Sequence, residues 1–190
     1  ILKARQMGLS TVIEALGYWW TTTHRNIHSL IIAHESSAAT NLYEMFKRYF
    51  DYSHSHFQPT RKYNNRKELV FDVDDRVKEE WQEHVSNCRD ESGECGVSHK
   101  PPGLGSSIKT MVAKEGKGRS LKLHFFHGSE VAFWEASADV ASSAMQAVPL
   151  AKNTFVFLES TANGVGGFFY DSWQNAKIGK SNLKPIFFAW

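Results

Sequence analysis

The sequence predicts an α/β protein with a mainly parallel sheet and helices on both faces. Short apolar runs alternate with segments of helical periodicity along most of the 190 residues, an order typical of parallel sheets. Several runs are apolar throughout, as in strands that are buried on both faces. With 42% hydrophobic and 22% charged residues, the chain is long enough for one sizeable core, so we expect a single domain.

The first half of the chain begins with a loop that opens a helix running to about Thr22. A β-branched run over Ser29–Ala33 predicts a buried strand, and apolar residues at helical spacing predict a helix from about Ser36 to Phe50. Residues 51–67 are polar and predict an exposed connection, after which Glu68–Asp72 is a predicted strand. The alternation of strand and helix thus starts early in the chain.

The second half contains a predicted surface insertion at about 74–106, with a charged helix over Asp74–Val85 and then no periodicity. The predicted elements after it are strands at 107–113, 121–127, 154–158 and 185–190, helices at 136–148 and 166–176, and a basic turn at 114–119.

The first eleven residues predict a degenerate phosphate-binding loop. The ordinary pattern is G-x-x-x-x-G-K-[ST], in which backbone N–H groups cradle phosphates, a lysine meets the β/γ-phosphates and a hydroxyl holds Mg²⁺. With Gly8 on the second glycine, Ser10 takes the hydroxyl position and Leu9 replaces the lysine. Lys3 then supplies the ammonium from the start of the loop, and Arg5 supplies a guanidinium. The alternative is a basic loop that caps a surface helix through Ser10.

Two further polar segments follow predicted strands. Glu130 comes after the apolar run that ends near His127 and is the candidate for orienting an attacking water, or else an exposed carboxylate at a strand end. Ser129 stands where a metal-holding Asp is usual, and its hydroxyl adds no negative charge. Ser160 and Thr161 follow the next run and are candidates for contacting a γ-phosphate, or else plain turn residues. Because ligands sit at the carboxyl ends of parallel strands, we expect all three segments at one edge of the sheet.

Jointly, three stretches resemble the large terminase subunit of tailed bacteriophages and prophages, the motor that packages DNA into procapsids. They are Leu2-Lys-Ala-Arg-Gln-Met-Gly-Leu-Ser-Thr11, the run from Gly118-Arg-Ser-Leu121 to His127-Gly-Ser-Glu-Val-Ala-Phe-Trp134, and Glu159-Ser-Thr-Ala-Asn-Gly164 with Phe169-Tyr-Asp-Ser-Trp173. The resemblance covers most of the chain outside the insertion. It implies an additional-strand P-loop NTPase fold that hydrolyses ATP with Mg²⁺.

The resemblance also implies site residues. Glu130 is the expected catalytic carboxylate, Arg5 a catalytic arginine acting in cis, Ser160 and Thr161 the coupling motif, and Ser10 with Ser129 the metal-holding hydroxyls. The expected nucleotide-binding residues are Lys3, Ala4, Arg5, Gln6, Met7, Gly8, Leu9, Ser10 and Thr11.

The partners implied are double-stranded DNA, the portal protein, the small terminase subunit and further copies in a ring on the procapsid, in the host cytoplasm and without a membrane. The adenine-contacting segment is expected before Ile1 and the nuclease domain after Trp190, so residues 1–190 are expected to be an ATPase domain without DNA cleavage. Two other functions stay open: a helicase-like nucleic-acid ATPase, or a nucleotide-binding assembly module that does not hydrolyse.

Composition adds bounds on the partners and the compartment. A formal net charge of +2 is not by itself evidence for a nucleic-acid partner. The sequence shows no signal peptide and no apolar run long enough to span a bilayer. Two cysteines in 190 residues favour a reducing compartment. His84, Cys88, Cys95 and His99 include zinc-ligand types at a spacing that fits no common zinc motif, and free thiols on a polar insertion are the alternative. Arg119 is either a solvated charge or a trans-acting arginine finger.

Overall fold

A computed structural model describes residues 1–55, 58–65, 67–90, 102–115, 122–135, 137–149 and 151–189. Its strands are β1 (Leu2–Lys3), β2 (His28–Ala33), β3 (Tyr63–Asn64), β4 (Glu68–Phe71), β5 (Ser106–Val112), β6 (Phe125–Ser129), β7 (Phe155–Glu159) and β8 (Phe187–Phe188). Its α-helices are α1 (Leu9–Thr23), α2 (Ser36–Tyr52), α3 (Asp75–Asp90), α4 (Ser137–Gln146) and α5 (Gly167–Lys177).

Six strands form one sheet in the order β3-β4-β5-β2-β6-β7, in which β5, β2, β6 and β7 are parallel neighbours. β1 and β8 form a parallel pair, and a bridge from Leu2 to Ser160 places β1 beside the end of β7. The described strands therefore run β3-β4-β5-β2-β6-β7-β1-β8 from one edge to the other. β4 is antiparallel to both of its neighbours, so the fold is mixed α/β with a mainly parallel sheet.

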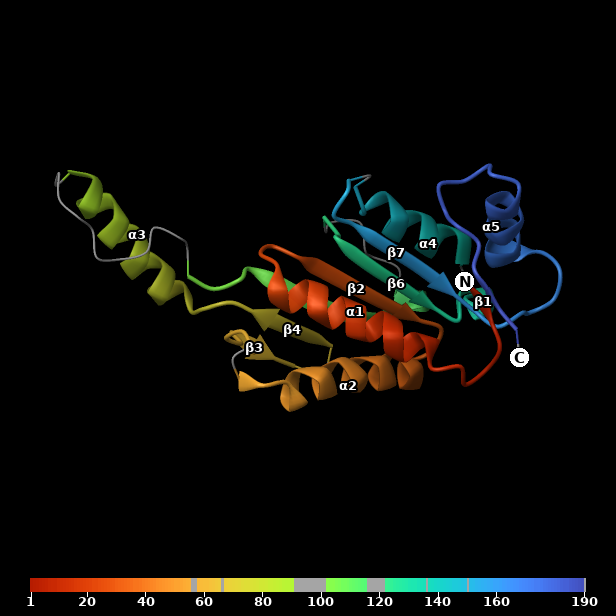
Figure 1. The fold of residues 1–190 in the computed structure, drawn as a ribbon, viewed down its shortest axis with the longest axis horizontal. Coiled ribbons are helices and arrows are strands. Elements are labelled where there is room, and N and C mark those ends of the chain that lie inside the picture. Colours follow the sequence, from red (N-terminus) through yellow and green to blue (C-terminus); the bar gives the residue numbers. More distant parts are fainter. Residues whose placement is uncertain are drawn as a thin grey trace.

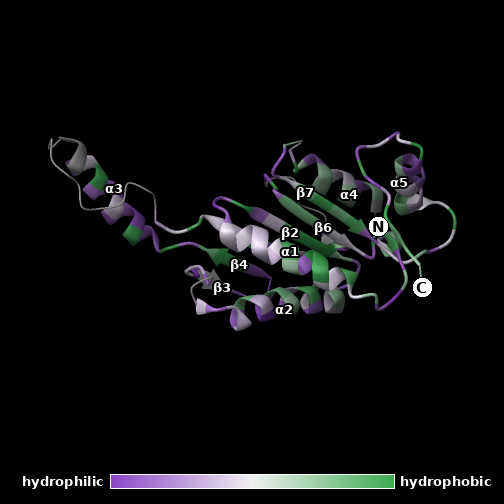
Figure 2. Ribbon diagram, in the orientation of Figure 1, coloured by the Kyte–Doolittle hydropathy of each residue, from purple (hydrophilic) through white to green (hydrophobic). Residues whose placement is uncertain are grey.

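Both faces of the sheet are covered by helices, as predicted (Figure 1). Alternate residues of β2 point to opposite faces: Leu30 packs in a cluster with α4 and α5, whereas Ile31 packs in a cluster with α2. Phe125 of β6 packs against α1 in a third cluster. Much of the central strands is green in Figure 2, since each presents apolar side chains to two helical layers.

Helix α3 projects away from the body of the molecule, at the opposite end from β1 (Figure 1). Most of its described side chains are exposed, and only Val85 is buried. The predicted charged helix of the insertion is therefore present and is longer than expected. None of the described helices is long and apolar enough to cross a bilayer.

Three sequence expectations differ from the structure. The strand expected at 121–127 lies further along the chain, because pairing with β2 and β7 begins at Phe125 and continues through Gly128 and Ser129. The polar connection at 51–67 contains the short strand β3, which pairs with β4. The final strand is only Phe187–Phe188, since its pairing with β1 spans two residues.

Candidate functional site

Three segments that are distant in the sequence meet at one edge of the sheet. β1 ends at Lys3, β6 at Ser129 and β7 at Glu159. Because β7 lies between β6 and β1, the residues after these strands are neighbours in space. This is the convergence that the order of strands and polar segments predicts.

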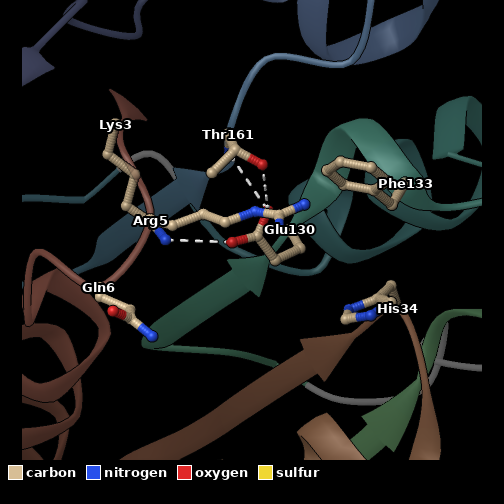
Figure 3. A pocket seen from close by; sticks show the side chains of 7 residues that line it. All are labelled: Lys3, Arg5, Gln6, His34, Glu130, Phe133 and Thr161. Atoms are coloured by element: carbon tan, nitrogen blue, oxygen red, sulfur yellow. Dashed lines mark hydrogen bonds and ion pairs between the residues drawn. The ribbon is translucent and has the colours of Figure 1, made fainter. Parts of the chain in front are cut away.

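The carboxylate of Glu130 lies at the centre of this edge (Figure 3). Its Oε1 is 3.1 Å from Lys3 Nζ. Its Oε2 accepts hydrogen bonds from the backbone N–H and the hydroxyl of Thr161, both at 3.1 Å, and one from the hydroxyl of Ser160 at 3.3 Å. Each of the three segments therefore has a residue in this cluster, and four interactions fix the orientation of one carboxylate.

Glu130 has a left-handed backbone, with φ 52° and ψ 46°. Such a conformation costs a residue with a Cβ roughly 1 kcal/mol or more and is concentrated at functional sites. Gln6 is left-handed as well, with φ 59°, and it lines the same pocket. The left-handed residues therefore lie directly after β6, at Glu130, and in the loop after β1, at Gln6.

The loop between β1 and α1 turns sharply, because Gly8 also has a positive φ of 69°. Helix α1 begins at the next residue, and the N–H groups of its first turn have no acceptor within the helix. The positive end of the helix dipole adds to these donors. Together they make the loop suited to an anion. Leu9, at the usual lysine position, packs instead against the apolar cluster of Ile13 and Phe125.

Lys3 supplies a cation that is almost fully enclosed. Its side chain is 7% exposed, and its Nζ lies 3.1 Å from Glu130 Oε1 and 3.6 Å from Glu159 Oε2. A buried ammonium is stable only beside compensating charge. The two carboxylates supply this compensation, and they hold Lys3 at the edge where the three segments meet.

Glu159 forms a second, deeper network beneath Glu130. Its Oε1 accepts hydrogen bonds from Ser10 Oγ at 2.6 Å and Ser129 Oγ at 3.0 Å, and it lies 3.2 Å from His127 Nε2. The other ring nitrogen of His127 lies 2.6 Å from Glu14 Oε1 on α1. Glu14, His127 and Glu159 are all fully buried.

The charges of this network follow from its contacts. Burial alone would raise the pKa of Glu159, but the hydrogen bonds from His127 and Ser10 and the charge of Lys3 lower that pKa to about 2. Burial would lower the pKa of His127, yet its bonds to Glu14 and Glu159 raise it to about 9. Burial raises the pKa of Glu14. A carboxylate at Glu159 therefore faces an imidazolium at neutral pH.

A pocket of about 360 Å³ opens beside Lys3, Glu130 and Thr161, and Figure 3 shows the side chain of Arg5 extending across it in front of Glu130. Arg5 is exposed, so its guanidinium is available to a ligand. The lining residues are Lys3, Arg5, Gln6, His34, Glu130, Phe133 and Thr161.

The remaining predicted residues differ in position. Ala4 is buried beneath the loop, whereas Met7 and Thr11 are exposed. The candidate zinc ligands Cys95 and His99, the side chain of Cys88 and the candidate finger Arg119 lie outside the described residues.

Sequence reasoning missed Glu159, His127, Glu14 and the two residues His34 and Phe133 of the pocket. The first two carried a signal, because each is an ionisable residue that directly follows a run of apolar residues in its strand. Such residues are rarely buried without a partner. The identity of that partner required the strand order.

No protein-family model matches the sequence, and no curated protein matches it. Solved structures do match. The large terminase ATPase domain of Thermus phage P74-26 superposes with a TM-score of 0.57 and 15% identity over 90% of this chain. A mutant of the same domain gives a TM-score of 0.57 and 14% identity, also over 90% of this chain. The chain spans 61% and 62% of the length of those two chains. The likeness shows a terminase-like fold.

Proposed function

We propose that the chain is the ATPase portion of a phage DNA-packaging motor and hydrolyses ATP with Mg²⁺. The proposal rests on one observation above all: Lys3, Glu130 and Thr161, from three distant segments, converge on one pocket beside the start of α1. The terminase-like fold supports it. So does the place of β7 between the loop-bearing β1 and the Glu130-bearing β6, because an additional-strand P-loop fold would have its additional strand there.

The loop supplies the groups that a triphosphate needs. The N–H groups around Gly8 and the first turn of α1 bind phosphate oxygens, Lys3 supplies an ammonium, and Arg5 supplies a guanidinium from the exposed side. Gln6, Met7, Leu9 and Thr11 contribute backbone positions to the same turn. Phosphoryl transfer depends mainly on such positioning and on charge stabilisation.

The buried oxygen groups beside Lys3 and Glu130 fit a hard divalent cation. Ser10 and Ser129 both present hydroxyl oxygens, and Glu159 has a buried carboxylate oxygen without a hydrogen-bond partner. Oxygen donors of this kind suit Mg²⁺. When bound with ATP, Mg²⁺ supplies charge neutralisation for the β- and γ-phosphates.

Glu130 is the group that orients the attacking water. Ser160 and Thr161 hold its carboxylate, so a change at the γ-phosphate can reach β7 through these hydrogen bonds. A phosphate that contacts Lys3 competes with Glu130 for the ammonium. We infer that nucleotide binding thereby frees the carboxylate for water.

The partners are proposed on the fold likeness and the motif resemblance together. They are double-stranded DNA, portal protein, the small terminase subunit and a ring of like subunits on the procapsid, in the host cytoplasm. A non-hydrolysing assembly module is the second candidate, and the apolar packing of Leu9 at the usual lysine position favours it.

Turnover by the full-length natural protein separates the two candidates. We expect Glu130→Gln to lower ATP turnover by a factor of about 10²–10⁴, the usual contribution of a positioned base, while nucleotide affinity stays within a few fold. Glu135→Gln is the matched control, because Glu135 is exposed and pairs only with Lys114 among the ion pairs of the described residues. A wild-type protein that binds ATP without hydrolysing it would establish the assembly-module function instead.

A further inference from the structure

The segment at the end of β6 lacks a carboxylate at Ser129, the position where a metal-holding Asp is usual. Ser129 directly precedes Glu130, and its hydroxyl can bind a metal-bound water but brings no negative charge. Mg²⁺ is usually held by one or two carboxylates together with substrate phosphates. Either the site holds the cation weakly, or another residue supplies the charge.

The register of the sheet places Glu159 directly beside Ser129. β6 and β7 pair in parallel, with Ser129 opposite Glu159. Neighbouring strands lie about 4.8 Å apart and paired side chains share a face, so these two residues occupy adjacent places at the same edge. The next strand therefore provides the carboxylate that β6 itself lacks.

The contacts of Glu159 place its carboxylate beside both of the proposed metal-holding hydroxyls. Its Oε1 accepts hydrogen bonds from the proposed metal hydroxyl Ser10 at 2.6 Å and from Ser129 at 3.0 Å. Its Oε2 is buried and has no hydrogen-bond partner, and Lys3 Nζ lies 3.6 Å away. Among the described residues, this oxygen has the Lys3 ion pair as its one charged partner and keeps lone pairs that a bound ligand can use.

A buried histidine holds the same carboxylate oxygen, Oε1, that accepts from Ser10 and Ser129. His127 Nε2 lies 3.2 Å from Glu159 Oε1, and Glu14 holds the other ring nitrogen. A carboxylate anchored in this way keeps one orientation toward Ser10, as outer partners do for metal ligands in general.

We propose that Glu159 supplies the metal-holding carboxylate of this site in place of an acidic residue at Ser129. The inference rests on the proposed function, since it concerns how the same site holds Mg²⁺ with nucleotide. Ser10 provides the hydroxyl and Glu159 the charge beside it. His127 and Glu14 act only by positioning Glu159.

The Mg²⁺ requirement for nucleotide binding by the full-length natural protein tests this. The probe is a fluorescent ATP analogue, titrated in EDTA and at increasing Mg²⁺. We expect Glu159→Gln to raise, by about tenfold or more, the Mg²⁺ concentration at which half of the gain in affinity for the ATP analogue is reached. The affinity for the analogue in EDTA should stay within a few fold of wild type. Glu135→Gln, which makes the same change at an exposed carboxylate, should leave the requirement unchanged.

A rescue variant moves the charge back to the neighbouring strand. Ser129→Asp combined with Glu159→Gln restores the carboxylate at the usual position, and we expect it to recover most of the lost Mg²⁺ sensitivity. A merely structural Glu159 would not be rescued in this way. Thermal melting of each variant reports folding, and if Glu159→Gln does not fold, Glu159→Asp takes its place because it keeps the charge but withdraws it by one methylene.

The outcomes are separable from those of the proposed function. A folded Glu159→Gln, or failing that Glu159→Asp, with the Mg²⁺ requirement of wild type overturns the inference alone. A wild-type protein that binds no ATP at any Mg²⁺ concentration overturns both.

Discussion

Lys3, the last residue of β1, forms ion pairs with the carboxylates of Glu130 and Glu159. Its ammonium arrives from the strand before the loop rather than from the first turn of α1, and it lies between Glu130 and Glu159. The side chain at the usual position, Leu9, contributes to the apolar cluster under α1. The charge at the site is thus kept while the helix start is used for packing.

Removing this ammonium is expected to weaken phosphate binding. Hydrogen bonds to charged groups contribute about 1.5–3 kcal/mol, so Lys3→Ala should weaken ATP affinity by roughly 10- to 100-fold, measured by titration with a fluorescent analogue. Lys3→Ala combined with Leu9→Lys restores a lysine at the ordinary position and should regain part of the affinity. Unchanged affinity in Lys3→Ala would refute the assignment of Lys3 to the phosphates.

Helix α1 lies close against β6 at a single small residue. A Cβ built on Gly17 would be 2.9 Å from Phe125 Cε1, and Phe125 is fully buried in the sheet. This close approach keeps the loop between β1 and α1 near the ends of β6 and β7. The helix accepts the lower helical propensity of glycine there because a larger residue does not fit.

Filling that contact is expected to destabilise the fold. Gly17→Ala should lower the free energy of unfolding by about 1–3 kcal/mol, the usual range for overpacking a core, despite the better helix propensity of alanine. Val12→Ala on the exposed face of the same helix should change it by less than about 0.5 kcal/mol. Chemical denaturation of both variants measures the difference, and equal stability would show that Phe125 moves aside freely.

Across the whole molecule, the buried network of Glu14, His127 and Glu159 connects the helix after the loop with two central strands. Each of the three segments thereby contributes one buried ionisable group to the same chain of contacts. The network should make stability depend on pH, because His127 gains carboxylate partners only in the folded chain.

This dependence has a defined direction. Hydrogen bonds to the carboxylates outweigh burial and raise the pKa of His127 from 6.5 to about 9. A pKa that is higher in the folded state stabilises the fold fully below about pH 6.5, and that contribution is lost as pH rises through about 9. We expect the melting temperature of wild type to fall over this interval.

His127→Asn provides the comparison. It removes the titrating imidazole, so its melting temperature should start lower and change less between neutral pH and pH 9. Equal slopes for the two proteins over that interval would contradict the assignment of the pH dependence to His127.

The sequence by itself determined the local elements and the general class of fold. The apolar run of β2 and the helical spacing of α2 predict the bounds of these elements to within two residues, since both patterns depend on neighbours within the same segment. The three polar segments were placed at strand ends for the same reason. The sequence does not predict the observed bounds of β6, because Gly128 and Ser129 join the strand only through pairing with β2 and β7.

Only the tertiary structure decided which side chains meet. Glu159 became the partner of Ser10 and Ser129 because β7 lies between β6 and β1, and strand order is a long-range property that no local pattern encodes. The same holds for Gly17, whose need to be small comes from Phe125, a residue more than a hundred positions away. Local periodicity fixes which face of an element is apolar, whereas the packing of distant elements fixes which charges are brought together.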